Sequence, residues 1–418
     1  MNMHEVATWF SCFAVIDFIF AEKLSGLEPS PKIDFNDTAI AFSGKGNKEL
    51  KWEYWLFRLM NNPTLTKFFS GLAQLSIRLH LPVKWIIRKT VYEQFCGGES
   101  LQEIVPVLKK LEEFHIDAII DYGVEGKETE QDFERTKTEL IRILEFTAGK
   151  SNIPFISCKV TGLTSFALLE KLSSGAALDA TETQDTERLY ERMHAIAAAA
   201  EAANTGLFID AEESWIQPAI DAITFTLCRQ YNKKEAVVYH TAQLYRHDRL
   251  AFCKTCLDDA RTHGYITGIK LVRGAYMEKE RKRAQEKNYP SPIQPDKETT
   301  DRDYNAAIDF CLQHIDNIAI CVATHNEASS MHAATEMAKK NIPPGHLHVS
   351  FSQLYGMSDQ ITYNLAKAGY RVSKYLPYGP VKDVIPYLIR RANENTSVSG
   401  QMSRELTLLD KEIKRRRI

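Results

Sequence analysis

The chain has 418 residues, of which 44% are hydrophobic and 25% are charged, so it can bury a sizeable core and has the composition of an ordinary soluble globular protein. The formal net charge is only −2, so no overall field favours nucleic acid, and we expect no nucleic-acid partner. A basic run at 411–417 is confined to the tail, where we expect a solvated helix end or, alternatively, contact with an acidic membrane surface.

Eight cysteines are spread along the chain without the spacing of a disulfide framework, which suits a reducing compartment. Cys253 and Cys256 form a C-x-x-C pattern, but it lies inside a stretch with helical apolar spacing at 249–263, and no second pair follows. A structural zinc site needs four ligands. We therefore predict that both thiols pack in the core and that the chain binds no metal.

The N-terminal part of the chain has a helical pattern. An apolar run at 9–20 is too short to cross a bilayer. The first lysine is Lys23 and the first arginine is Arg58, which argues against a secretory signal and against an arginine-rich transit peptide. Further apolar residues follow at helical spacing. We predict a helical accessory region at 1–90 and a catalytic domain at 91–418, in a cytoplasmic protein.

Beyond about residue 100, helical stretches alternate with short apolar segments that we interpret as buried strands. These eight segments lie at 118–122, 155–159, 207–210, 236–239, 269–273, 318–324, 346–351 and 372–376. Alternation of strands and helices implies parallel pairing. Eight such units fit a (βα)8 TIM-type barrel of the α/β class better than an open sheet, whose outer strands would show more polar alternation.

Polar residues follow the predicted strands, at the end of a barrel where active sites lie. They are Asp121, Glu125, Lys159, Asp210, Gln243, Lys270, Arg273, Tyr276, Thr324, His325, Asn326, Gln353, Tyr375 and Tyr378. A single one of them could simply cap a helix or face solvent. As a set they indicate a site, because charged side chains directly after buried apolar runs require partners. Lys159 could pair with Asp210 or with Glu125.

The fifth predicted strand has the strongest local signal. Gly274 and Ala275 end it with side chains small enough for another group to approach the backbone. Lys270 and Arg273 place positive charge at this end, and Tyr276 adds an aromatic face with a hydroxyl. The alternative is a buried strand with a charged exit.

Two adjacent arginines, Arg390 and Arg391, lie in the helical pattern after the eighth predicted strand. Adjacent residues on a helix point about 100° apart, so one can reach inward while the other serves a neighbour. Their guanidinium groups could bind a carboxylate bidentately over the barrel mouth. The alternative is a pair of arginines on a solvated helix face.

Six separated motifs resemble those of the proline dehydrogenase family, the FAD-dependent enzymes that open proline catabolism. They are Lys270-Leu-Val-Arg-Gly-Ala-Tyr276, Asp210-Ala-Glu-Glu213, Thr324-His-Asn326, Gln353-Leu-Tyr-Gly-Met357, Tyr375-Leu-Pro-Tyr-Gly-Pro380 and Arg390-Arg-Ala-Asn-Glu394. The chain is similar to the monofunctional members. The resemblance implies a distorted (βα)8 barrel with FAD at the carboxyl ends of the strands, and no G-x-G-x-x-G fingerprint contradicts it.

The resemblance also implies roles for individual residues. Asp210 and Lys270 would be catalytic, with Lys270 near the flavin N5. The substrate-binding residues would be Lys159, Tyr276, Leu354, Tyr375, Arg390 and Arg391, with the two arginines holding the proline carboxylate. The residues in contact with FAD would be Ala211, Gln243, Lys270, Arg273, Gly274, Ala275, Thr324, His325, Gln353 and Glu394. Glu125 matches a residue that closes the site, as a gate.

The expected reaction is the oxidation of L-proline to 1-pyrroline-5-carboxylate, with electrons passed to a quinone. A membrane quinone would bring peripheral contact with the inner membrane, and a eukaryotic member would lie in the mitochondrial matrix. Two alternatives stay open. One is a hydroxyproline dehydrogenase on the same fold, which the presence of Tyr375 disfavours. The other is a barrel lyase that uses Lys159 or Lys270 as a Schiff-base nucleophile.

Overall fold

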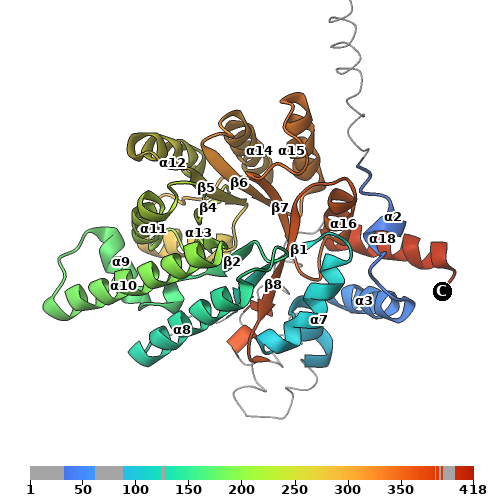
Figure 1. Ribbon diagram of the computed structural model, residues 1–418, viewed down its shortest axis with the longest axis horizontal. Coiled ribbons are helices and arrows are strands. Elements are labelled where there is room, and N and C mark those ends of the chain that lie inside the picture. The colour runs from blue at the N-terminus through green and yellow to red at the C-terminus, as the bar shows by residue number, and fades with distance from the viewer. Residues whose placement is uncertain (1–32, 62–87, 124–127, 382, 386, 389–400) are drawn as a thin grey trace, which may run out of the picture. The chain divides into compact units, whose positions relative to one another are not determined.

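The computed structural model describes residues 33–61, 88–123, 128–381, 383–385, 387–388 and 401–418. Four predicted site residues lie outside this part of the chain, namely Glu125, Arg390, Arg391 and Glu394, and so does the apolar run at 9–20. From Phe35 onward the described residues form one compact unit, which Figure 1 shows as a ring of helices around central strands.

Eight parallel strands close into a barrel in chain order, and β1 pairs with both β2 and β8 to complete the ring (Figure 1). The strands are β1 (Asp117–Tyr122), β2 (Phe155–Cys158), β3 (Gly206–Ile209), β4 (Val238–Gln243), β5 (Thr267–Val272), β6 (Ile318–Ala323), β7 (Val349–Leu354) and β8 (Val372–Tyr378). Helices cover the barrel from outside, as parallel sheets require. The predicted (βα)8 barrel is confirmed.

The predicted bounds of the seventh and fourth strands are wrong by three or more residues, and the two ends have the same cause. The seventh strand was placed at 346–351, whereas β7 begins and ends three residues later, and its Ser350, Ser352 and Gln353 are all buried. The fourth was ended at 239, whereas β4 continues to the buried Gln243. An apolar run marks a strand only where its inward side chains are apolar. In both strands buried polar side chains continue beyond the apolar run, so the run ends before the strand does.

A long excursion lies between β2 and β3, where α9 (Phe166–Ser174) and α10 (Ala180–Ala203) follow each other. The start of α10 is a capping box, since Asp179 accepts a hydrogen bond from the Glu182 amide and Glu182 accepts one from the Asp179 amide, both at 2.8 Å. The other helices between strands are α8 (Glu130–Thr147), α11 (Gln217–Tyr231), α12 (Arg249–His263), α13 (Met277–Lys287), α14 (Lys297–Gln313), α15 (Glu327–Lys339) and α16 (Asp359–Lys367). Cys253 and Cys256 are buried in α12, so their predicted core position is confirmed.

Helices from both ends of the chain pack together beside the barrel. Before β1 come α2 (Thr38–Ala41), α3 (Asn47–Met60), α6 (Glu93–Phe95) and α7 (Leu101–Glu112), and after β8 comes α18 (Gln401–Arg416). Phe42, Phe57, Phe95, Met357 and Leu408 share one apolar cluster, which therefore joins α2, α3, α6, the β7 exit and α18. The basic run at the tail lies largely in α18, as a helix end. The domain boundary at residue 90 stays a prediction.

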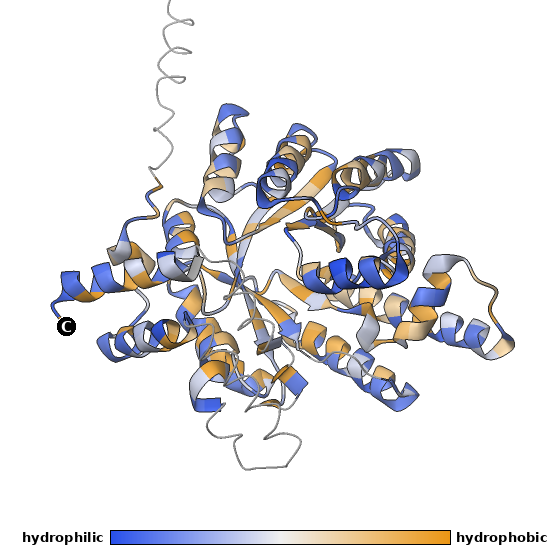
Figure 2. Cartoon of the chain, turned by 180° about the vertical axis from the view of Figure 1, so that it is seen from behind, coloured by the Kyte–Doolittle hydropathy of each residue, from blue (hydrophilic) through white to orange (hydrophobic). Residues whose placement is uncertain are grey.

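An aromatic layer fills the inside of the barrel. The rings of Phe155 and Phe208 stack with centroids 4.5 Å apart, and Tyr239 meets both edge-on at 5.3 and 5.2 Å. A side chain on Gly206 would lie 2.3 Å from the Phe155 ring, and one on Gly268 would lie 2.4 Å from the Tyr239 ring. Both glycines are therefore needed to admit the rings. Figure 2 shows the matching hydropathy, with hydrophobic strands inside and hydrophilic outer faces on the helices.

The polar side chains of the barrel interior begin directly above this aromatic layer. Side chains two residues apart on a strand share a face, so the residue after next along each strand lies one layer nearer the barrel mouth. On β2 Phe155 is followed in this way by Ser157, and on β3 Phe208 is followed by Asp210. The polar layer therefore stands directly on the aromatic one.

We predict that Gly268→Ala lowers the free energy of unfolding by about 1–3 kcal/mol, because the new methyl group overlaps the Tyr239 ring in a filled core. Gly345→Ala is the matched control, since its nearest neighbouring atom would be 4.0 Å away, and it should change stability by less than about 0.5 kcal/mol. Urea denaturation of both variants measures this. Equal midpoints would show that the aromatic layer tolerates the methyl group.

Candidate active site

The carboxylate of Asp210, just after β3, is the centre of the polar layer. It accepts hydrogen bonds from Ser157 Oγ at 2.7 Å, Lys159 Nζ at 2.7 Å, Lys270 Nζ at 2.5 Å and Tyr375 Oη at 3.0 Å. These donors come from β2, the β2 exit, β5 and β8. One buried side chain thus brings together residues from four parts of the barrel, including three that the sequence predicted for the site.

The charge of Asp210 is fixed by its partners. Burial would raise the pKa of this carboxyl group, but the ammonium groups of Lys159 and Lys270 outweigh burial and hold its pKa well below the ordinary range. Asp210 is therefore ionised at neutral pH. Of the two partners that the sequence offered for Lys159, the described structure pairs it with Asp210.

Tyr375 and Lys270 hold each other in place above the aromatic layer. Lys270 Nζ lies 4.8 Å from the ring centroid of Phe208 and 5.4 Å from that of Tyr375, so aromatic faces flank the ammonium group. Burial, with Asp121 and then Asp210 nearby, raises the pKa of the Tyr375 phenol well above its usual value. The phenol therefore stays protonated and donates a hydrogen bond to Asp210. Leu354 stands beside Tyr375 across the β7–β8 pairing.

The β5 exit is held by Arg273. Its guanidinium group donates to Asp301 Oδ1 at 2.8 Å, to Thr324 Oγ1 at 2.5 Å and to Ser329 Oγ at 3.0 Å, and it lies 4.4 Å from the Tyr304 ring centroid. These contacts join β5 to α14, to the β6 exit and to α15. Arg273 thus reaches the polar edge that follows β6.

Gly274 and Ala275 are exposed where the chain leaves β5. Gly274 has φ +135°, and a side chain on it would lie 2.4 Å from the Tyr245 ring, so both conformation and packing require glycine. The Ala275 amide donates to Gln243 Oε1 at 3.2 Å, and Gln243 Nε2 donates to the Glu212 carbonyl at 2.8 Å. Gln243 therefore connects the β5 exit to the β3 exit.

The exits of β6 and β7 form a second polar edge. Gln353 Nε2 donates to the Thr324 carbonyl at 3.1 Å and Gln353 Oε1 accepts from Thr362 Oγ1 at 2.8 Å. His325 Nδ1 lies 2.9 Å from Ser358 Oγ. Of the remaining predicted site residues, Ala211 lies in the loop after β3, and Tyr276 is buried at the start of α13.

Two residues of this layer were not predicted. Ser157 shares its strand face with Phe155 and Lys159, but its uncharged side chain does not by itself require a partner, so the sequence does not mark it as a site residue. Glu212 is buried, accepts a hydrogen bond from the Thr161 amide at 3.1 Å and another from the Thr161 hydroxyl, and burial raises its pKa to about 7. It lies within a recognised motif, but nothing in the sequence distinguishes it from its neighbour Glu213.

We predict that Asp210→Ala destabilises the fold by about 3–5 kcal/mol, because it removes the counter-ion of the buried Lys270 and of Lys159, whose side chain is 13% exposed. In a double-mutant cycle with Lys159→Ala, we expect a coupling of about 0.5–3 kcal/mol from denaturant unfolding. Strict additivity would show that the Lys159–Asp210 contact carries no energy.

The charge of Asp210 also predicts an acid response. Its folded-state pKa lies below the unfolded value of about 3.9, so its stabilising contribution is complete well above that unfolded value, begins to fall as the pH drops below it, and is lost as the pH falls through the folded-state pKa. The stability gap between the native protein and Asp210→Asn should therefore narrow from about pH 7 to about pH 3.5. Urea denaturation at both pH values measures the gap, and a constant gap would contradict the assigned charge.

Comparison with known proteins identifies the family. A family model described as proline dehydrogenase matches residues 104–404. The chain is 34% identical to a hydroxyproline dehydrogenase from Xenopus laevis, over 90% of each chain, and 29% identical to a mitochondrial proline dehydrogenase 1 from Dictyostelium discoideum, over 92% of this chain and 75% of that one. The fold is similar to that of proline utilization A from Bdellovibrio bacteriovorus, with a TM-score of 0.67 and 20% identity over 86% of this chain. The chain spans 38% of the length of that larger protein.

The closed eight-stranded barrel, the Asp210-centred polar layer at its mouth and a family model that covers most of the sequence agree with one another. This chain belongs to the proline dehydrogenase family of oxidoreductases.

Proposed function

We propose that this protein is an FAD-dependent enzyme that oxidises L-proline to 1-pyrroline-5-carboxylate. The observation that carries the proposal is the contact set of Asp210. It joins Lys159, Lys270 and Tyr375 into one layer at the barrel mouth, and these are residues that the family resemblance assigns to substrate and catalysis. Both lysines are bound to Asp210 as ion pairs, an arrangement that does not present either amine as a Schiff-base nucleophile.

The donor set around the barrel mouth suits a dinucleotide. Amide, guanidinium, hydroxyl and imidazole groups lie at the carboxyl ends of four successive strands, β4 to β7, and come from Gln243, Arg273, Thr324, His325 and Gln353. Gly274 and Ala275 are small and exposed beside them. An elongated ligand with phosphate and ribose groups needs such donors along its length. We infer that these residues, with Ala211, Lys270 and Glu394, would hold FAD.

The reaction needs a neutral proline amine, because a protonated nitrogen cannot stabilise the developing iminium ion. The bound cofactor would supply an acceptor for the hydride equivalent that leaves the ring carbon next to nitrogen. The chain's own part is to position the substrate. We infer that Arg390 and Arg391 bind the carboxylate, that Leu354, Tyr276 and Tyr375 enclose the ring, that Asp210 with its lysines fixes the polar end of the pocket, and that Glu125 closes it.

The visible spectrum of the purified protein tests the cofactor. Flavin bands that bleach when L-proline is added without oxygen support the proposal. A colourless protein that borohydride traps on a lysine in the presence of substrate would overturn it in favour of a lyase.

Hydroxyproline is the second candidate substrate, and the similarity to the Xenopus enzyme over 90% of both chains favours it. Tyr375 favours proline. Its phenol is bonded to Asp210 and its ring stands beside Leu354, so a 4-hydroxyl group on the substrate would have to displace the ring or be buried without a partner.

We predict that the native enzyme prefers proline to hydroxyproline by about one to two orders of magnitude in kcat/KM, and that Tyr375→Ser narrows this gap. Tyr375→Phe is the matched control, because it keeps the ring and removes the bond to Asp210, so it should keep the preference. Steady-state kinetics on both substrates measures this. If Tyr375→Ser lowers both efficiencies by one factor, the residue supports the fold and does not select the substrate.

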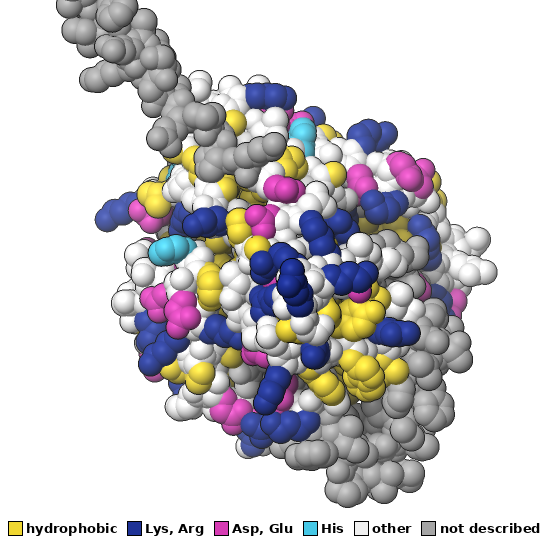
Figure 3. All heavy atoms as spheres, turned by 90° about the vertical axis from the view of Figure 1, so that its right-hand side faces the viewer, with side chains coloured by type: hydrophobic (Ala, Val, Ile, Leu, Met, Phe, Trp, Pro, Cys, Tyr) yellow, Lys and Arg dark blue, Asp and Glu magenta, His cyan; other side chains and the backbone are white. Residues whose placement is uncertain are grey.

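We also infer that the electrons pass to a quinone and that the protein touches a membrane surface peripherally. No helix in the described residues is long and apolar enough to cross a bilayer. One face of α3 instead carries exposed Trp52 and Trp55, which are 40% and 53% exposed and stack at 5.4 Å, with Lys48, Lys51 and Arg58 on the same helix. Figure 3 faces the side of α2, α3 and α18, where lysine and arginine side chains gather beside hydrophobic ones.

Aromatic and basic side chains together suit an anionic membrane interface on the cytoplasmic side, or on the matrix side in a mitochondrion. Cosedimentation with vesicles of anionic and of neutral lipid tests this contact. If the protein binds neither kind of vesicle, the proposed membrane contact is wrong.

A further inference from the structure

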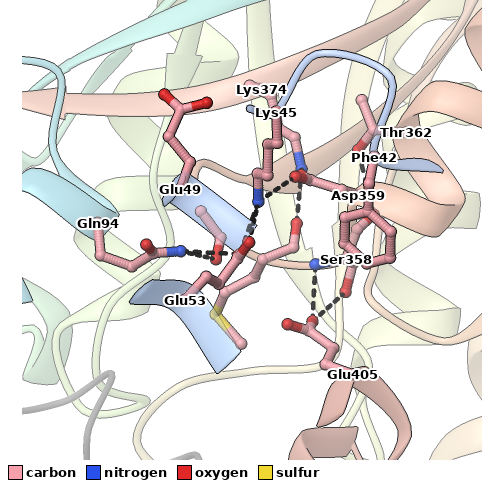
Figure 4. Close-up of polar contacts among 12 residues, drawn as sticks. Phe42, Lys45, Glu49, Glu53, Gln94, Ser358, Asp359, Thr362, Lys374 and Glu405 are labelled. Carbon is pink, nitrogen blue, oxygen red and sulfur yellow. Dashed lines mark hydrogen bonds and ion pairs between the residues drawn. The ribbon is translucent and has the colours of Figure 1, made fainter. Parts of the chain in front are cut away.

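A buried polar network lies where the β7 exit meets the helices from the two ends of the chain (Figure 4). Asp359, the first residue of α16, accepts Lys374 Nζ from β8 and Lys45 Nζ from the α2–α3 connection, both at 2.7 Å. Lys45 Nζ also reaches Glu53 on α3 at 2.5 Å, and Gln94 Nε2 donates to Glu53 at 3.0 Å. Asp359, Lys374 and Glu53 are buried, and the Lys45 side chain is only 17% exposed, so the network fixes the terminal helices against the barrel.

Glu405 on α18 enters this network from the other side. Its Oε1 accepts the Ser358 amide at 2.7 Å and the Ser358 hydroxyl at 3.3 Å (Figure 4). Ser358 precedes α16 in the left-handed conformation, with φ +54°. The same hydroxyl oxygen lies 2.9 Å from His325 Nδ1. Glu405, Ser358 and His325 thus form a relay from the last helix to the β6 exit.

The single hydroxyl proton of Ser358 determines which group donates and which accepts in each hydrogen bond of this relay. A hydroxyl group has one proton to donate and two lone pairs that accept. When Ser358 donates its proton to the Glu405 carboxylate, its oxygen can only accept from His325. The imidazole then carries its proton on Nδ1, and the opposite nitrogen, Nε2, is presented away from the relay. A hydrogen bond at one ring nitrogen sets the role of the other in this way.

We propose that Glu405 is a positioning residue for His325, acting through the Ser358 hydroxyl, so that the last helix of the chain sets the orientation and tautomer of a histidine at the cofactor edge. This rests on the proposed function in one respect, namely that His325 contacts FAD.

The relay should respond to pH near neutrality. Burial raises the pKa of Glu405 to about 7, against the hydrogen bond from the Ser358 amide, with Glu53 and Asp359 adding to the rise and Lys374 opposing it. These groups face Glu405 from α3, α16 and β8, Lys45 lies beyond Asp359, and His325 stands at the far end of the relay. Above about pH 7 the carboxylate is charged and accepts the serine proton. Below about pH 7, Glu405 is protonated and no longer requires the Ser358 hydroxyl to donate to it.

The test measures FAD release from the full-length protein by equilibrium ultrafiltration. We expect Glu405→Gln to raise the dissociation constant for FAD roughly 2- to 12-fold at pH 8, the range of one hydrogen bond, and to converge with the native protein at pH 6. Ser358→Ala should weaken binding to a similar extent, and the two changes together should add little beyond either. Glu412→Gln is the matched control, because Glu412 is a buried glutamate of the same helix that pairs with Arg415 and Arg416.

Several outcomes would overturn the relay. If Glu405→Gln affects FAD release no more than Glu412→Gln, Glu405 only helps α18 to pack. If Glu405→Gln and His325→Ala weaken binding additively, Glu405 does not act through the histidine. Should the native protein bind no FAD, the proposed function fails instead. The relay is then judged by ¹⁵N NMR of His325, which must show the proton on Nδ1 in the native protein at pH 8 and a shift toward Nε2 in Glu405→Gln.

Discussion

The Asp210 carboxylate imposes the constraint on which the barrel mouth depends. Burying an unpaired carboxylate would cost several kcal/mol, a large share of a domain's stability margin, so the charge must meet its partners as the barrel closes. Those partners come from β2, the β2 exit, β5 and β8, on both sides of the ring. A one-residue change of register in one of these strands would move a donor to the opposite face. The ion pairs therefore form only when the strands of the barrel close in the native register, and the same ion pairs make up the site.

The aromatic layer makes this arrangement precise. Because Phe155, Phe208 and Tyr239 fill the interior beneath Asp210, the polar groups have no room to sink, and water has little space below them. Gly206 and Gly268 permit this packing because they have no side chain that would overlap the rings. The aromatic layer therefore supports the site rigidly. Sequence differences between family members with different substrates can be confined to residues above this layer, such as Tyr375.

Much of the fold was predictable from the sequence, since eight apolar segments separated by helical patterns leave few arrangements. The Asp210–Lys159 pair was also accessible, because a charge after a buried run needs a partner. The limits have a common cause. Periodicity reports burial only through apolar residues, so the buried Ser350, Ser352 and Gln353 displaced the predicted β7. Residues such as Ser157 and Glu405 have roles only through contacts between distant segments, which no local pattern carries.

The two polar assemblies divide the barrel mouth between them. Asp210 serves the side of β2, β3, β5 and β8, while Asp359, Ser358 and Glu405 serve the exit of β7 and the helices from both chain ends. Lys374 and Tyr375 are neighbours on β8, and adjacent residues of a strand point to opposite faces. Lys374 therefore reaches outward to Asp359, and Tyr375 reaches inward to Asp210. A displacement of β8 must disturb both assemblies at once, which couples the packing of the terminal helices to the geometry of the substrate pocket.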